Sequence, residues 1–324
     1  MVNDNFQWGL VGYGDLARKR LAAALQQAEG STLTGIWGRD KAQAQALADN
    51  NDVPVVYDQF DDMINSDIDA IYVATPADTH FEYAARAIEK GKHVVVEKPM
   101  ASNTQECLDL VELAKQHDVK LGVAFYLRYQ PKMGRIKQLI DEGVLGKITW
   151  VNISCHGWYN PSTDDPKYWR VQKARSAGGG AVADIGVHRF DLLDYWLGES
   201  SVIWSGEQRL AHDYEVEDGS SAVLALPGGA YVHTYFAWNT KSSSDRFEIT
   251  GTEGKILIDS LLSPHFSLIR NGQREEFEVP PVENAYINLA EDFIDSVRTN
   301  RQPLSSGESG MRSNRLLERV LDWG

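Results

Sequence analysis

Short apolar strands alternate with amphipathic helical segments through residues 1–122, and this alternation limits the fold more than any other feature of the chain. Apolar residues recur at helical spacing between the strands, as at Ala17, Leu21 and Leu25. Strand–helix alternation at this rhythm predicts a parallel sheet covered by helices on both faces. The strands are predicted at 7–11, 32–37, 53–57, 70–74, 93–97 and 120–124.

The pattern changes from about Gly146 onward. Runs such as "KITWVNISC" and "RFEITGTEGKILID" are strand-like and are joined by short glycine-containing turns, which predicts a large, mainly antiparallel sheet. A helical stretch at 186–197 interrupts the strands, and the C-terminal segments are again helical. We therefore expect an α/β chain of two domains, 1–122 and 123–324, with C-terminal helices packing back on the first and a cleft between the domains as the site.

Composition excludes several classes of partner. The 324 residues carry a formal net charge of -14 without any basic run, which argues against nucleic acid and anionic membranes. The N-terminus lacks the pattern of a secretory signal and no apolar run approaches a membrane span, so a cytoplasmic protein is expected. Cys107 and Cys155 have no CxxC motif or histidine at metal spacing, so we expect free thiols and no metal site.

A glycine-rich turn follows the first predicted strand and opens a helix. It reads Gly12-Tyr13-Gly14-Asp15-Leu16-Ala17, a GxGxxA pattern. Gly12 permits the tight turn, Gly14 lets the backbone approach a pyrophosphate, and a small Ala17 lets the helix pack closely on the strand. In an alternating α/β domain this pattern predicts dinucleotide binding at 1–122, the alternative being a purely structural turn.

A buried strand also ends abruptly in charge, in the sequence "KHVVVEKPM". In a doubly wound sheet, ligands bind beyond the carboxyl ends of the strands, where the glycine turn, "ATPADTH" and "EKP" should meet. Lys98 is then expected where a nicotinamide meets its substrate, although it could be an exposed turn lysine. A sharp turn aiming Lys98 inward further predicts a cis Lys98–Pro99 peptide. Thr75, Pro76 and His80 are candidates to border the cofactor.

The end of the second strand predicts which cofactor is used. An NAD-preferring domain usually places an acidic residue there, but here the strand ends in Trp37-Gly38-Arg39. Gly38 presents no carboxylate to repel a phosphate, and Arg39 offers a forked donor suited to one. Asp40 is interpreted as the N-cap of the helix beginning at Lys41. NADP(H) is therefore expected to be preferred, with NAD(H) still possible.

Three segments together resemble the glucose–fructose oxidoreductase/inositol dehydrogenase (Gfo/Idh/MocA) family. They are "GLVGYGDLA", "IDAIYVATPADTHFEYAARAIEKGKHVVVEKPM" and "GGGAVADIGVHRFDLLDYWLG", and the resemblance extends over essentially the whole chain. It implies a Rossmann domain followed by an α/β domain with a large open sheet. It also implies hydride transfer between NAD(P) and a hydroxyl or carbonyl carbon of a sugar, polyol or related small molecule.

The catalytic candidates are Lys98, Asp184 and His188. Asp184 and His188 are four residues apart and share one face if the segment is helical. A histidine of pKa near ~6.5 can carry the hydroxyl proton, and a carboxylate can orient it. The resemblance implies that His188 is the general acid/base, Asp184 its partner or a substrate ligand, and Lys98 a donor to the reacting oxygen. Which of Lys98 and His188 transfers the proton is left open, and a surface Asp–His pair is the simpler alternative.

The resemblance adds further candidates and one departure. Asparagine is frequent in the family at the position of Tyr126, and the tyrosine form looks more like the branch of dihydrodiol and xylose dehydrogenases. The loop at 156–177 matches no named enzyme, and its aromatic residues suit substrate stacking or interface packing equally. The further cofactor candidates are Glu97, Arg128, Trp169 and Arg170, and the substrate candidates are Lys98, Tyr159, Arg170, Asp184 and His188.

Two alternative functions, and a prediction of the oligomeric state, complete the expectations. A nicotinamide-assisted glycosidase would show no net absorbance change at ~340 nm, and a non-catalytic nucleotide-binding sensor would show no turnover. The strand "AYVHTYFAW" carries bulky groups on both faces, from which we expect a homodimer or homotetramer formed through the sheet.

Overall fold

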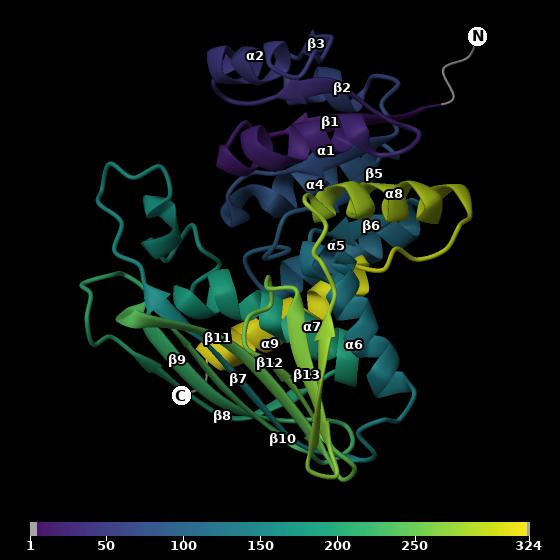
Figure 1. Cartoon of the computed structure of the whole chain (residues 1–324). Helices are drawn as coiled ribbons and strands as arrows, with labels where there is room; N and C mark the ends of the chain where they lie inside the picture. Colours follow the sequence, from purple (N-terminus) through teal and green to yellow (C-terminus); the bar gives the residue numbers. More distant parts are fainter. Residues whose placement is uncertain (1–4, 323–324) are drawn as a thin grey trace. The chain divides into compact units, whose positions relative to one another are not determined.

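The computed structural model describes residues 5–322. The chain divides into two compact units, each built around its own sheet (Figure 1). The first unit is Met1–Tyr129 with Asn284–Met311, and the second is Gln130–Glu283 with Arg312–Gly324. In the described part of the chain, no helix is long and apolar enough to cross a membrane.

The first unit contains a six-stranded sheet in the order β3-β2-β1-β4-β5-β6, and each neighbouring pair is parallel. This order reverses between β1 and β4, which is the switch point of a doubly wound sheet. Its strands are β1 Phe6–Val11, β2 Ser31–Trp37, β3 Val55–Val56, β4 Ala70–Val73, β5 His93–Val96 and β6 Leu121–Val123. Its helical elements are η1 Ala17–Leu21, α1 Ala22–Gln27, α2 Lys41–Asp49, α3 Phe60–Ile64, η2 Ala77–Thr79, α4 His80–Glu89, α5 Thr104–Gln116, η3 Tyr126–Tyr129 and α8 Ala285–Arg298.

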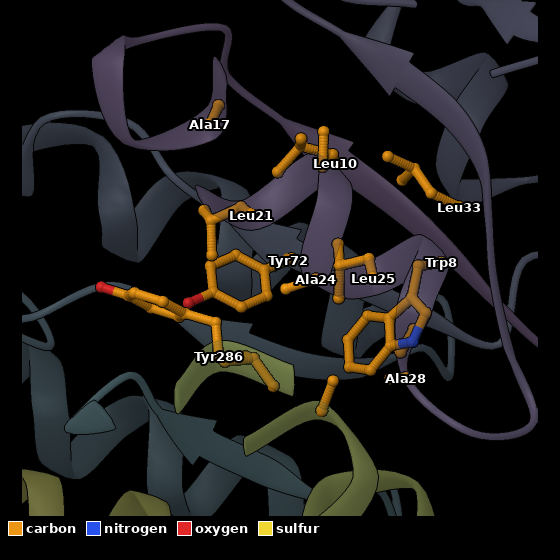
Figure 2. Packing of buried hydrophobic residues seen from close by; sticks show 14 of the residues in the cluster. Trp8, Leu10, Ala17, Leu21, Ala24, Leu25, Ala28, Leu33, Tyr72 and Tyr286 are labelled. Atoms are coloured by element: carbon orange, nitrogen blue, oxygen red, sulfur yellow. The ribbon is translucent and has the colours of Figure 1, made fainter. Parts of the chain in front are cut away.

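One face of this sheet packs into a core with α1, α2 and α8. Alternate residues of β1, Trp8 and Leu10, point into it, together with Leu25 of α1 and Phe293 of α8. Figure 2 shows part of this cluster, with Tyr72 of β4 and the other labelled side chains in one buried group. The run of β-branched residues in β5 is buried because the strand is central and covered on both faces.

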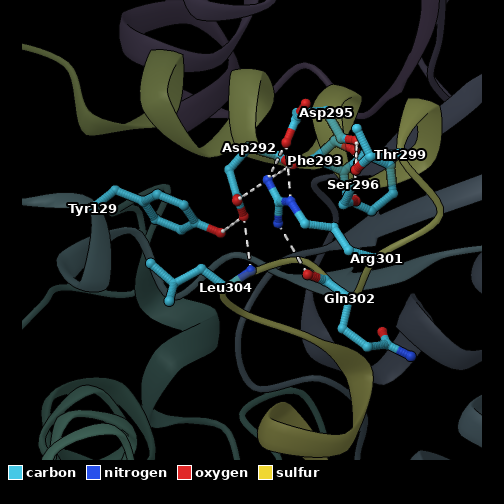
Figure 3. A network of polar contacts seen from close by, with 9 residues as sticks. All are labelled: Tyr129, Asp292, Phe293, Asp295, Ser296, Thr299, Arg301, Gln302 and Leu304. Carbon is cyan, nitrogen blue, oxygen red and sulfur yellow. Dashed lines mark hydrogen bonds and ion pairs between the residues drawn. The ribbon is translucent and has the colours of Figure 1, made fainter.

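A polar network fastens α8 to the rest of the first unit (Figure 3). The carboxylate of Asp292 accepts hydrogen bonds from the Tyr129 hydroxyl at 2.9 Å and the Leu304 backbone N–H at 2.8 Å. It also pairs with Arg301 at 2.7 Å. These contacts tie a helix near the C-terminus to η3, so the first unit depends on residues far apart in the sequence.

The second unit contains an eight-stranded sheet in the order β14-β13-β12-β11-β7-β10-β9-β8. Its recorded pairings are antiparallel except that of β10 with β7, which is parallel. The strands are β7 Ile148–Trp158, β8 Ser201–Gln208, β9 Gly219–Ala225, β10 Tyr231–Ala237, β11 Asn239–Gly251, β12 Lys255–Ile258, β13 His265–Arg270 and β14 Gln273–Glu278. The helical elements are α6 Pro131–Asp141, η4 Tyr168–Val171, η5 Val182–Gly186 and α7 Val187–Leu197, while α9 Gly307–Leu321 runs through both units.

The α/β fold class is confirmed, while local details differ. Asn103 caps α5 by accepting a hydrogen bond from the backbone N–H of Glu106. The Thr79 hydroxyl does not cap α4 and instead bonds to the Thr75 hydroxyl and the Pro76 carbonyl. Both free thiols are confirmed within the described residues.

Candidate functional site

The glycine turn has the geometry of a nucleotide-binding loop. Gly12 has φ +114, and a Cβ there would lie 2.5 Å from the Ala74 carbonyl oxygen. Only glycine suits that conformation and that contact. At Gly14 the reverse holds, since a Cβ would meet nothing within 4 Å. The protein itself does not require glycine at this exposed position, so the open space over the turn is the cradle that a pyrophosphate would need.

The helix after this turn begins with a π-helical segment, η1, before continuing as α1. The expected small residue, Ala17, is buried against the core. The side chain of Asp15 pairs with Lys19 at 2.9 Å, and Leu16 packs on the core cluster. Any contact of these two residues with a cofactor would therefore use their backbone groups at the helix N-terminus.

The residues expected to determine the preference for NADP(H) over NAD(H) lie at the end of β2. A Cβ at Gly38 would clash with the Tyr13 ring, so the missing side chain makes room for the tyrosine. Arg39 is exposed, and in residues 5–322 it makes no ion pair. Asp40 accepts from the backbone of Gln43 at 3.1 Å and caps α2, as predicted. Its carboxylate is thus engaged in the helix, and the guanidinium of Arg39 is the available charge.

His80 connects two loops at the carboxyl edge of the sheet. Its ring nitrogens lie 2.8 Å from the Thr75 carbonyl, in the loop after β4, and 2.8 Å from the Pro99 carbonyl, after β5. Burial lowers the pKa of the imidazole, and the side chain is only 1% exposed. The side chain therefore braces the two loops, while the other candidates to border the cofactor, Thr75 and Pro76, are partly exposed at the edge.

Two charged residues, Glu97 and Lys98, directly follow the buried strand β5. The carboxylate of Glu97 turns into the first unit, where it accepts from the Tyr72 hydroxyl at 2.9 Å and the Lys98 backbone N–H at 3.3 Å. Lys98 is partly exposed, and the Lys98–Pro99 peptide is cis, as expected. Glu97 is 7% exposed, and these two hydrogen bonds engage both oxygens of its carboxylate.

Arg128 was a further cofactor candidate. Its guanidinium is buried and donates to the Leu304 carbonyl at 3.0 Å, beside the Asp292 network. That contact gives the side chain a structural function in the first unit.

In the second unit, Asp184 lies in the π-helical segment η5 and His188 in the first turn of α7. The Arg170 guanidinium donates to the Asp184 carboxylate at 3.1 Å and lies over the Trp169 ring, 5.6 Å from its centroid. The structure thus joins Trp169, Arg170 and Asp184 through two side-chain contacts, and His188 follows Asp184 along the same helical segment. π-Helical turns occur often at functional sites, and here both described ones coincide with predicted site segments.

An aromatic cluster adjoins the same segment. Tyr159 and Tyr168 pack with Ile185 against a core that contains Trp238. The rings of Tyr159 and Trp238 are 4.8 Å apart, and the Tyr159 hydroxyl donates to the Lys167 carbonyl. Tyr159 therefore shapes the surroundings of Asp184 and remains partly exposed.

Sequence reasoning missed Glu217. Its carboxylate, 1% exposed, accepts from the backbone N–H groups of Gly180 at 2.6 Å and Val182 at 2.9 Å, at the start of the segment that carries Asp184. A Cβ at Gly180 would clash with the Glu217 carbonyl, which explains one glycine of the triplet. Burial raises the pKa of Glu217 to about 7. No local pattern marks it, because its partners are backbone groups of a distant segment.

Comparisons with known proteins agree with this geometry. Residues 6–125 match the family model for the oxidoreductase family with an NAD-binding Rossmann fold, and residues 133–257 match the GFO/IDH/MocA C-terminal domain. An oxidoreductase, P35, of Formosa agariphila is 30% identical, with 96% of this chain and 97% of that protein covered. A D-xylose 1-dehydrogenase [NADP(+)] of Haloarcula marismortui is 26% identical, with coverage of 94% and 87%.

One solved structure extends the agreement to three dimensions. The aldose-aldose oxidoreductase of Caulobacter crescentus, complexed with glycerol, has a TM-score of 0.88 and 26% identity. The match covers 98% of this chain and 96% of that one.

Proposed function

Because the chain belongs to the GFO/IDH/MocA family of NAD(P)-binding oxidoreductases, we propose that it is an NADP(H)-preferring dehydrogenase or reductase of an aldose or related polyhydroxy compound. The observation that carries this proposal is the placement of Lys98. Lys98 lies at the carboxyl edge of the sheet, the same edge that carries the glycine turn. Its backbone N–H donates to the Glu97 carboxylate, and the carbonyl of the next residue, Pro99, contacts the His80 ring. A lysine whose backbone is held at the carboxyl edge of such a sheet can present its ammonium to a reacting oxygen.

The residues present fit a dinucleotide. Gly12 and Gly14 leave the turn open for the pyrophosphate, and Arg39 is the exposed cation for a ribose phosphate. When bound, NADP⁺ supplies a hydride acceptor and NADPH a hydride donor. The aldose class is supported by the names of the two relatives that act on aldoses.

The chain's own residues then handle the proton and the charge. We assign His188 to take the hydroxyl proton during oxidation and to return it during reduction. The Lys98 ammonium stabilises the developing alkoxide, and Asp184, fixed by Arg170, orients a substrate hydroxyl. His188 is buried and follows Asp184 by four residues along the same helical segment.

The activity is tested by following absorbance at ~340 nm with NADP⁺ or NAD⁺ against a panel of aldoses, polyols and sugar acids. We expect net reduction of NADP⁺ by at least one aldose, with a higher kcat/KM for NADP⁺ than for NAD⁺. Cleavage of a glycoside without net absorbance change would instead identify a glycosidase. NADPH binding without any turnover would identify a sensor.

Cofactor choice is tested with two neighbouring variants. Arg39→Ala should raise KM for NADP⁺ about tenfold or more, the loss of one or two charge-assisted bonds, and leave KM for NAD⁺ nearly unchanged. Asp40→Ala is the matched control, because its side chain caps α2 and should change stability without changing cofactor preference. A wild-type enzyme that uses NAD⁺ more efficiently would overturn the assignment of Arg39.

A further inference from the structure

We propose that Glu97, held by the Tyr72 hydroxyl, is a positioning residue that fixes and electrostatically tunes the Lys98 ammonium. This inference rests on the proposed function insofar as Lys98 is taken to act on the reacting oxygen. Glu97 is a buried carboxylate with no assigned step in the proposed reaction. It contacts Lys98 through the Lys98 backbone N–H.

The groups around the Glu97 carboxylate come from two elements of the first unit, β4 and α8, and from the backbone of Lys98. Tyr72 lies on β4 and donates its hydroxyl to the carboxylate at 2.9 Å. The Tyr286 phenol, in the first turn of α8, is close enough to the carboxylate for each group to shift the pKa of the other. The Lys98 backbone N–H donates to the other carboxylate oxygen at 3.3 Å. A carboxylate with donors on both oxygens has little rotational freedom, so the peptide it holds is fixed as well.

The two tyrosines are themselves immobilised. Both are buried in the core cluster drawn in Figure 2, and the Tyr286 ring stacks on Tyr126 with centroids 5.1 Å apart. Phenols in such packing can present their hydroxyls at one orientation only. The Lys98 turn is therefore supported by rigid elements, β4 and α8, as a site that needs fixed geometry requires.

A second contact restrains the other side of the same turn. The Pro99 carbonyl lies 2.8 Å from the His80 ring, whose other nitrogen lies 2.8 Å from the Thr75 carbonyl. Lys98 is thus held at its N–H by Glu97 and at the next carbonyl by His80. Because the turn is restrained at both ends, the flexible Lys98 side chain starts from a fixed backbone position.

The charge of Glu97 is close enough to influence Lys98. Burial raises the pKa of Glu97 to about 7, while the Tyr72 hydrogen bond and the Lys98 charge oppose the rise. The groups that face this carboxyl are the Tyr72 phenol from β4, the Tyr286 phenol from α8 and Lys98 itself, with Arg20 and Tyr126 around Tyr286 and Tyr129 near Tyr72. The Lys98 charge lowers the pKa of Glu97, so the two charged groups interact across this turn.

The experiment measures the reactivity of Lys98 without any substrate. The full chain is labelled with a trace of acetic anhydride between about pH 6 and 9, and acetylation of Lys98 relative to exposed lysines is read by mass spectrometry. In the wild type, we expect relative labelling of Lys98 to fall as pH rises through about 7, where Glu97 ionises. In Glu97→Gln the inflection should vanish, and labelling at about pH 8 should rise roughly threefold or more.

A pair of buried tyrosines separates positioning from general loss of stability. Tyr72→Phe removes the hydroxyl that holds Glu97, whereas Tyr129→Phe removes a hydroxyl that also bonds a carboxylate at 2.9 Å, that of Asp292. Only Tyr72→Phe should shift the Lys98 labelling curve. On the best aldose of the panel it should lower kcat about tenfold with KM for NADP⁺ nearly unchanged.

Identical Lys98 labelling curves in wild type, Glu97→Gln and Tyr72→Phe would overturn the inference. Altered curves in an enzyme whose Lys98→Ala variant keeps full turnover would instead overturn the proposed function and leave the link between Glu97 and Lys98 standing. Equal effects of Tyr72→Phe and Tyr129→Phe would reduce the role of Tyr72 to ordinary structural support.

Discussion

Lys98 and His188 lie on different units and are assigned different tasks, so their removal should affect the reaction and spare cofactor binding. We expect Lys98→Ala and His188→Ala each to lower kcat about 100-fold or more, the usual loss of a positioned donor or acid/base group. NADPH affinity, measured by fluorescence titration, should stay within a few fold. Lys90→Ala and His117→Ala are exposed controls and should behave as wild type. A His188→Ala enzyme with normal turnover would remove that residue from the mechanism.

Glu217 should make stability depend on pH in a way that its glutamine variant does not. Burial raises its folded-state pKa from 4.5 to about 7, so the folded protein binds the extra proton between those values. The free energy of unfolding therefore falls as pH rises through this window and is constant for this group above it. A shift of this size corresponds to about 3 kcal/mol.

Chemical unfolding of wild type and Glu217→Gln at several pH values checks this expectation. The difference in unfolding free energy between the two should change across pH 4.5 to about 7. Glu89→Gln, at an exposed position, should show no such change. Parallel curves for wild type and Glu217→Gln would show that Glu217 titrates normally.

At the scale of elements, the glycine turn offers two substitutions with opposite consequences. Gly12→Ala forces a side chain to φ +114 and against the Ala74 carbonyl, and should destabilise the first unit by at least ~2 kcal/mol. Gly14→Ala meets no protein atom, so its melting temperature should match wild type while NADPH binds at least about tenfold more weakly. Calorimetry and fluorescence titration separate the two effects. Normal NADPH affinity in Gly14→Ala would mean that the phosphates do not approach this turn.

The strands of the first unit could be predicted from the sequence, whereas contacts between distant residues could not. Five of the six predicted strands of the first unit appear within one residue at either end, because apolar runs and glycine turns are local signals. The predicted strand at 53–57 shortens to Val55–Val56, at the sheet edge. Lys98 and the Asp184–His188 segment were proposed from local motifs. The hydrogen bonds of Glu97 to Tyr72 and of Glu217 to Gly180 could not be predicted, because tertiary packing alone creates them.

At the scale of the whole molecule, the exposed face of the second unit's sheet supports the proposal of a homodimer or homotetramer. Trp204 of β8 and His233 of β10 share a row of the sheet, and Trp150 pairs with the exposed Tyr231. Aromatic groups gathered on one sheet face are typical of an interface. Light scattering at micromolar concentration should give at least twice the mass of one chain. Trp204→Glu should lower that mass, and a monomeric wild type would refute the assembly.

The central claim is hydride transfer between the nicotinamide and a sugar carbon, and isotope transfer tests it most directly. The protein is incubated with NADPH deuterated at C4 of the nicotinamide and with the carbonyl forms of the panel compounds, and the products are analysed by mass spectrometry. We predict an alcohol product carrying one carbon-bound deuterium from the matching C4 epimer, formed about 100-fold more slowly by Lys98→Ala. Product formed without deuterium from either epimer, or no product from any compound, would contradict the account.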